Sequence, residues 1–124
     1  MGAEHDLSSA AIAAAIRIHQ RLGPGLLESA YDECLALQLT LWKHRVERQV
    51  KVPIVFEEHR VRAAYRIDLL VDGVLVIEVK AVERVLPIHM AQLRTYLRLS
   101  GHNDGLILNF CAPTMKEGIR RISI

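Results

Sequence analysis

Apolar spacing predicts two helices in the first third of the chain. Alanine and isoleucine dominate residues 8–22, with Ser8 or Ser9 as the N-cap and Gly23-Pro24-Gly25 as the end of the helix. A second helix is predicted over residues 26–43. Its apolar residues recur every three or four positions, at Leu27, Ala30, Cys34, Leu37 and Leu41. This spacing is typical of a helix that buries one face.

Strand patterns follow the second helix. Residues 46–56 alternate and are β-branched, and residues 62–71 and 74–82 are rich in valine, leucine and isoleucine. Asp72-Gly73, a common hairpin turn, connects the last two segments. The sequence therefore predicts three consecutive strands.

A third helix and two short strands complete the predicted fold. The helix begins at Pro87, runs to residue 99 and ends before Gly101, and the strands cover residues 106–110 and 119–124. The resulting order, α α β β β α β β, predicts an α/β fold with a mixed sheet flanked by helices and a right-handed strand–helix–strand crossover. No repeat or linker interrupts residues 1–124, so we expect a single domain.

Composition excludes several classes of protein. A chain that is 51% hydrophobic and 24% charged is typical of globular proteins rather than disordered ones. No uncharged stretch approaches the roughly 20 apolar residues of a membrane helix. Glu4 and Asp6 stand where a secretory signal carries positive charge, so we expect a cytoplasmic protein. No Cys-x-x-Cys pair indicates a zinc site or a disulfide framework.

The net charge of +2 is unevenly distributed. Residues 43–66 and 84–124 each sum to +4, whereas residues 1–42 and 67–83 each sum to −3. Most of the basic residues are arginine, whose guanidinium suits bidentate contacts to phosphate. Ordinary solvated surface charge explains this distribution equally well.

Three charged residues interrupt the apolar strands. Glu78 and Lys80 share one face of their strand because side chains alternate. A regular two-residue turn at Asp72-Gly73 would place Asp68 on the opposite face, whereas a three-residue loop or a bulge would place it beside Glu78. We therefore predict a connection with an odd number of residues or a bulge. A regular two-residue turn would argue against a shared site unless Asp68 lies beyond the paired region.

Two carboxylates and a lysine suit hydrolysis of a nucleic-acid backbone. Carboxylates hold hard divalent ions such as Mg²⁺, which lower the pKa of bound water and neutralise charge on a phosphodiester. A neighbouring ammonium orients the nucleophile and stabilises the transition state. The alternative is a structural ion pair between Lys80 and Asp68 or Glu78.

Polar residues on two helices extend this candidate site. Glu28 falls between Leu35 and Leu39 in angular position, so we expect it to point toward the core, unless it serves as a capping or ion-paired carboxylate. Gln92 and Tyr96 share one stripe of the third helix, where they can bond to phosphate or hold an active-site side chain. The alternative is that they face solvent.

Several motifs resemble known nuclease motifs. Residues 25–31, Gly-Leu-Leu-Glu-Ser-Ala-Tyr, resemble the motif that names the GxxExxY family. Asp68 with Glu78-Val79-Lys80 resembles the signature of the PD-(D/E)xK nuclease superfamily, although Ile67 replaces its proline. Residues 92–96 resemble the Q-x-x-x-Y element of the RecB-like branch. The resemblance spans about residues 16–121 and implies a restriction-endonuclease-like fold.

The resemblance also implies roles for individual residues. Asp68 and Glu78 would bind Mg²⁺ or Mn²⁺, Lys80 would orient water and stabilise the transition state, and Glu28 would complete the acidic cluster. Gln92 and Tyr96 would organise the site or contact the substrate, and His19 would be either a metal ligand or a buried, hydrogen-bonded histidine.

The function implied is that of a metal-dependent nuclease. The alternatives are a non-catalytic module of the same fold, which binds nucleic acid or a partner protein, and a purely structural domain. We expect the partner to be nucleic acid, DNA foremost, and the contacts to be with its backbone, because no helix-turn-helix, zinc finger or aromatic platform is evident. Cutting both strands often requires two copies of a small nuclease, so a homodimer is kept as an alternative.

Overall fold

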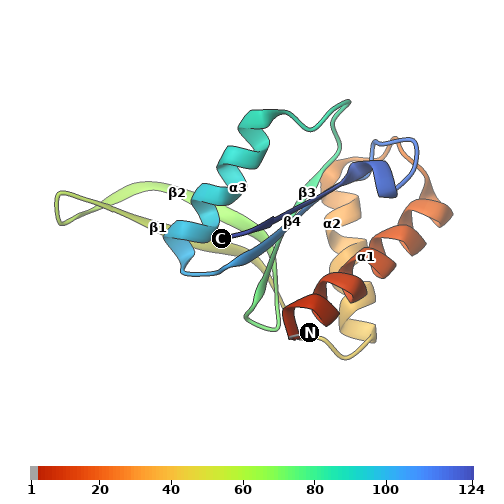
Figure 1. The fold of residues 1–124 in the computed structure, drawn as a ribbon, viewed down its shortest axis with the longest axis horizontal. Coiled ribbons are helices and arrows are strands. Elements are labelled where there is room, and N and C mark those ends of the chain that lie inside the picture. The colour runs from red at the N-terminus through yellow and green to blue at the C-terminus, as the bar shows by residue number, and fades with distance from the viewer. Residues whose placement is uncertain (1–2) are drawn as a thin grey trace.

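The fold follows the predicted order of helices and strands (Figure 1). The computed structural model describes residues 3–124, and the side chains of residues 3–6, 63 and 64, which include the charges of Glu4 and Asp6, lie outside the description. The elements are α1 (Ala3–Leu22), α2 (Glu28–Leu41), β1 (Val46–Phe56), β2 (His59–Val71), β3 (Leu75–Lys80), α3 (Pro87–Ser100), β4 (Asp104–Asn109), a 3₁₀ turn η1 (Lys116–Gly118) and β5 (Ile119–Ser123).

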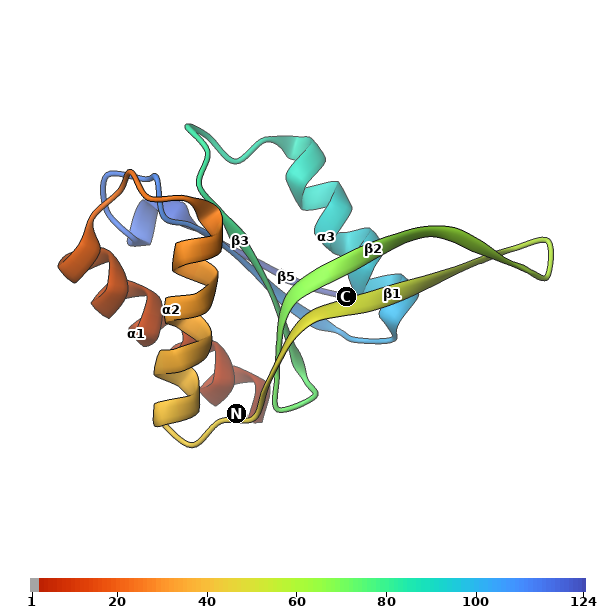
Figure 2. The ribbon, with the colours of Figure 1, turned by 180° about the vertical axis from the view of Figure 1, so that it is seen from behind.

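Five strands form one mixed sheet between two helical layers. The strand order is β1-β2-β3-β4-β5, and only β3 and β4 are parallel neighbours, joined through α3. Helices α1 and α2 cover one face of the sheet and α3 covers the other (Figure 2). The predicted mixed sheet flanked by helices is therefore confirmed.

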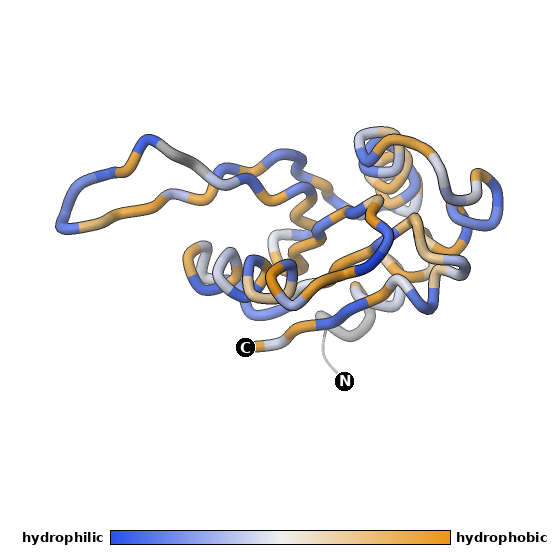
Figure 3. Tube along the Cα trace, turned by 90° about the horizontal axis from the view of Figure 1, so that it is seen from above, coloured by the Kyte–Doolittle hydropathy of each residue, from blue (hydrophilic) through white to orange (hydrophobic). Residues whose placement is uncertain are grey.

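Each face of the sheet contributes to its own apolar core. Leu75, Ile77 and Val79 of β3 pack with α1 and α2, whereas Val76 packs with Leu93 of α3. A central strand covered on both faces is expected to be apolar almost throughout. Apolar colouring accordingly follows the central strands in Figure 3. Glu78 is therefore an exception within a strand that is otherwise apolar up to Lys80.

The first two strands extend beyond this layered body. Strands β1 and β2 have 11 and 13 residues, against six in β3, and their far halves project as a two-stranded ribbon (Figures 1 and 2). Glu57 and Glu58 form the turn at its tip, both with positive φ. We call residues 50–66 the arm.

The connection between β2 and β3 has three residues, as the charge pattern predicted. Val71 pairs with Leu75, which leaves Asp72, Gly73 and Val74 in the turn. Asp72 accepts hydrogen bonds at 2.8 Å from the Arg45 N–H and, through its other carboxylate oxygen, from the His44 ring. The His44 bond lowers the pKa of Asp72. This register places Asp68 opposite Glu78.

Two predictions about the helices are wrong. Helix α1 begins five residues before Ser8, so Ser8 is not its N-cap but a buried residue inside the helix. The buried face of α2 is not the predicted stripe, because Leu37 and Leu41 are exposed. The buried face contains Tyr31 instead, whose ring stacks on that of Phe110 with ring centroids 4.5 Å apart. The other buried residues of α2 are Asp32, Leu35, Ala36 and Leu39.

The remaining differences are small shifts of element ends. Strand β2 begins at His59, three residues before the predicted start, because the hairpin with β1 continues to Phe56. Strand β3 ends at Lys80 rather than at Val82. Within residues 3–124, no helix has the length and apolar character needed to cross a membrane.

Candidate active site

Two carboxylates meet where β2 separates from β3. Pairing of the two strands reaches Leu69 and Ile77, and beyond it the Asp68 carboxylate accepts a hydrogen bond from the Val79 N–H at 2.7 Å. Asp68 is half-buried, and Glu78 is only 6% exposed. We call this place, where β2 and β3 separate beside Asp68 and Glu78, the fork. Asp68 lies on its β2 side, and Glu78 lies on its β3 side.

Burial makes both carboxylates reluctant to ionise. It raises the pKa of Glu78 to about 8, and the charge of Asp68 adds to this rise. Burial also raises the pKa of Asp68 to about 6, although the Val79 hydrogen bond opposes the rise. Among the described residues, Glu78 Oε1 is buried without a hydrogen-bond partner. The pair therefore needs a proton or a cation to offset its charge.

The oxygen donors at the fork fit a divalent cation. Two neighbouring carboxylates, one with an unsatisfied buried oxygen, are hard ligands of the kind that Mg²⁺ and Mn²⁺ prefer. Among the side chains that the structure describes, no three from His, Cys, Asp or Glu come close enough to hold an ion together. An ion at this pair would therefore keep water or substrate oxygens as its other ligands, as Mg²⁺ commonly does.

Lys80 supplies positive charge to the same site. It lies two residues after Glu78, at the end of β3, and its backbone carbonyl accepts the Phe110 N–H at 2.9 Å. Its charge lowers the pKa of both Asp68 and Glu78, but less than burial raises them. Among the described side chains, Lys80 forms no salt bridge. The ammonium group is thus not held in a structural ion pair.

Helix α2 brings a second acidic group to the fork. Glu28, its first residue, lines a cavity of about 340 Å³ together with Asp32 and Asp68. The prediction that Glu28 points into the core is wrong, because it is exposed in the first turn, where the helix has only just begun. Glu28 and Asp32 both raise the pKa of Asp68.

Asp32 and its partner Arg48 were not predicted from the sequence. Asp32 is only 4% exposed, and one of its oxygens accepts hydrogen bonds from the Arg48 guanidinium at 2.9 and 3.1 Å. Its position one helical turn after Glu28 was the available signal. No pattern in the sequence connects Arg48 of β1 with α2. Gln49, which follows Arg48 and has the positive φ of 54°, also lines the cavity and was missed.

A comparison with protein families shows the superfamily of the chain. The model of a family described as the PD-(D/E)XK nuclease superfamily matches residues 5–122. The chain belongs to this superfamily. No curated protein and no solved structure gives a significant match. Membership and architecture together confirm the predicted restriction-endonuclease-like fold.

The α3 residues lie beside the acids of this PD-(D/E)XK fold. Burial raises the pKa of Tyr96, and the nearby charges of Glu78 and Asp68 add to the rise. Its ring lies 5.4 Å from that of Tyr65, centroid to centroid, at an angle of 38°. Gln92 lines a cavity of about 280 Å³ with both tyrosines. An aromatic pair that was not evident from the sequence thus borders the site.

His19 does not line the cavity beside Asp68. His19 is buried, and its Nε2 lies 2.8 Å from the Ala112 carbonyl oxygen. It lines a different cavity, with Gln20 and Met115, and shares no metal-binding group among the described residues. The structure therefore favours a buried, hydrogen-bonded histidine over a metal ligand.

Proposed function

We propose that the protein is a Mg²⁺- or Mn²⁺-dependent nuclease that hydrolyses phosphodiester bonds in nucleic acid. The observation that carries the proposal is the buried Glu78 carboxylate, which faces Asp68 with one oxygen unsatisfied and a strongly raised pKa. Superfamily membership supports the same activity. The motif at residues 25–31 and the pair Gln92 and Tyr96 further support membership of the GxxExxY family and its RecB-like branch.

Each residue of the fork has a distinct role in this proposal. Asp68 and Glu78 hold the ion, which when bound supplies an acidified water and neutralises charge on the phosphodiester. Lys80 donates to the attacking water and to the phosphoryl oxygens, because its ammonium group is free of salt bridges among the described side chains. Glu28 extends the acidic cluster at the rim of the cavity.

Residues of α3 would contact the substrate. The Tyr96 hydroxyl and the Gln92 amide can donate to phosphate oxygens next to the bond that is cleaved. The charges of Glu78 and Asp68 reach Tyr96, and Gln92 lines one cavity with Tyr96 and Tyr65, which supports this role. DNA as the preferred substrate, a single domain over residues 1–124, a cytoplasmic location and a homodimer remain predictions of this proposal.

A cleavage assay tests the proposed activity. The purified protein is incubated with labelled single- and double-stranded DNA and RNA, in Mg²⁺, Mn²⁺ or EDTA. We expect cleavage only with metal, and we expect Lys80→Ala to abolish it while Lys116→Ala, an exposed lysine of η1, leaves it intact. Cleavage in EDTA, or cleavage unaltered by Lys80→Ala, would contradict the proposal. Metal-independent binding without any cleavage would favour the non-catalytic module.

A further inference from the structure

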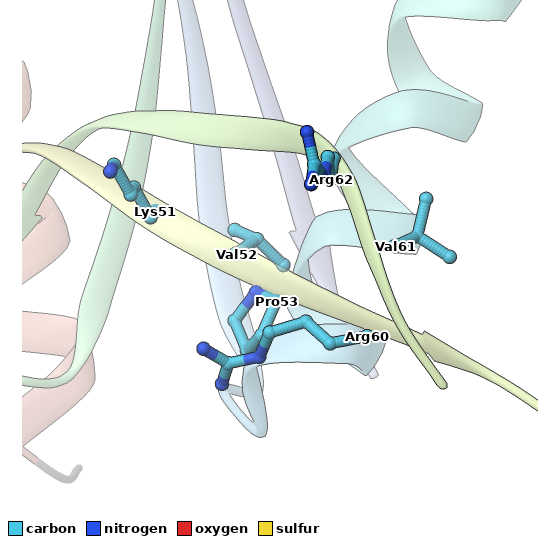
Figure 4. A pocket seen from close by; sticks show the side chains of 6 residues that line it. All are labelled: Lys51, Val52, Pro53, Arg60, Val61 and Arg62. Atoms are coloured by element: carbon cyan, nitrogen blue, oxygen red, sulfur yellow. The ribbon is translucent and has the colours of Figure 1, made fainter. Parts of the chain in front are cut away.

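The arm contains an irregularity in the pairing of its two strands. Val52 pairs with Tyr65 and Ile54 with Val61, so β2 has three residues where β1 has only Pro53. A cavity of about 540 Å³ lies against the arm at this register shift (Figure 4). We call it the arm gap; its lining residues are Lys51, Val52, Pro53, Arg60, Val61 and Arg62.

The charge at the arm gap is entirely positive. Lys51, Arg60 and Arg62 line it and are exposed, and no acidic side chain does so among the described residues. Lys51 also pairs directly with Arg66 across the ladder. Like charges at directly opposed positions destabilise a strand pair, and no salt bridge among the described side chains relieves them. An anion bound beside these cations would relieve their repulsion.

The positively charged residues of the arm form a row that runs from the proposed metal ligands, Asp68 and Glu78, toward the tip of the arm. Arg66 precedes Asp68 by two residues on β2, about 7 Å along the strand, and Lys51 lies across from Arg66. The arm gap follows immediately, and Glu57 and Glu58 at the tip end the run of positive charge. A polyanion that reaches Asp68 can therefore follow the arm as far as the gap but is repelled from the tip.

We propose that the arm gap binds the phosphate backbone of the nucleic-acid substrate at nucleotides remote from the cleaved bond. The inference rests on the proposed nuclease function and names the surface that holds the substrate during cleavage. Arginine and lysine contacts to phosphate carry no base specificity. The arm therefore sets affinity and minimum substrate length, whereas the fork performs the chemistry.

Salt dependence measures the number of phosphate contacts directly. Each contact contributes about 0.7 to the slope of log K against log salt for single strands and about 0.9 for duplex DNA. Loss of the three gap cations should therefore reduce the slope by about 2 to 3. Affinity at moderate salt should fall by about 10- to 100-fold.

The test compares two triple variants with equal charge change. Lys51→Gln/Arg60→Gln/Arg62→Gln removes the gap cations, and Arg17→Gln/Arg21→Gln/Lys116→Gln removes three exposed cations outside the arm. Binding of fluorescent oligonucleotides is followed by anisotropy in EDTA over a salt series, so that cleavage plays no part. We expect only the gap variant to lose affinity and slope for long oligonucleotides, and neither to change binding of oligonucleotides of about four nucleotides.

Further outcomes separate this proposal from the nuclease function. The charge-preserving variant Lys51→Arg/Arg60→Lys/Arg62→Lys should bind like wild type, and Arg62→Gln alone should lower the slope by about 1. Equal slopes for both triple variants, with wild-type cleavage intact, would overturn the role of the gap and leave the nuclease standing. The gap variant could also lose self-association, measured by light scattering, while it keeps its oligonucleotide binding. That result would overturn the proposal, because the arm gap would then bind a second copy of this chain.

Discussion

Replacing Glu78 by glutamine should remove most of the pH dependence of stability between about pH 6 and 8 in the metal-free protein. The pKa of Glu78 is about 8 in the folded chain, against 4.5 for an ordinary glutamate. Between these values the folded state binds a proton that the unfolded state has released. Stability is therefore fully present below about pH 4.5 and falls as the pH rises toward about 8.

The size of the effect follows from the raised pKa. Each pH unit between 4.5 and about 8 corresponds to about 1.4 kcal/mol, which sets an upper limit near 5 kcal/mol. Water entry and local relaxation lower this cost, so we expect a loss of about 2 to 4 kcal/mol in EDTA. The glutamine amide shifts the whole curve by a constant amount, because it does not titrate. The slope, rather than the absolute stability, therefore reports the carboxylate.

Urea denaturation in EDTA at several pH values measures the slope. Glu33→Gln, at an exposed position of α2, is the matched control and should keep the wild-type slope. Mg²⁺ at 100 times its Kd should stabilise wild type by about 2.7 kcal/mol at about pH 8. The same Mg²⁺ concentration should stabilise it less at about pH 5, where the acids bind protons instead. A wild-type curve parallel to that of Glu78→Gln would refute the buried acidic pair, and equal Mg²⁺ stabilisation of both proteins would refute its role in metal binding.

Three further predictions concern the fork and its supports. Lys80→Met should lower single-turnover cleavage by about 100-fold or more while leaving the Mg²⁺-induced shift in melting temperature in place. Arg48→Ala should cost about 1 to 3 kcal/mol in urea denaturation because it leaves the buried Asp32 without its partner, and adding Asp32→Asn should recover part of that loss. Gly118→Ala should lower the melting temperature by several degrees, because a Cβ there meets the Asn109 carbonyl oxygen.

The central sheet and the register of its acids could be predicted from sequence. Apolar segments bounded by turn and capping residues predicted the bounds of β1, β3 and α3 to within about two residues. The positions of Asp68 and Glu78 required an odd turn between them, and the three-residue connection satisfies this requirement. Charge in a strand that is otherwise buried is a strong constraint because burial of an isolated carboxylate is costly.

The rotation of α2 could not be predicted in the same way. Its leucines are spread around the helix, and two apolar stripes compete for the sheet. The contact of Tyr31 with Phe110, almost 80 residues later in the chain, decides between them. The same rotation buries Asp32 and leaves Glu28 at the exposed start of the helix. The spacing of apolar residues within α2 cannot predict a rotation that depends on contact with the distant Phe110 ring.

The separation of β2 and β3 at the fork explains why Asp68 and Glu78 can occur in the middle of the sheet. Strand β2 pairs with β3 only from Leu69 onward, so the Val79 N–H has no partner in the regular ladder, and the Asp68 carboxylate accepts it instead. A buried N–H without a partner is costly, so Asp68 has a structural role as well as the proposed ligand role. Glu78 has no such structural bond at Oε1. The two acids should therefore differ on mutation: Asp68→Ala leaves the Val79 N–H without its acceptor and weakens the fold, whereas Glu78→Gln removes the charge that opposes folding above about pH 5.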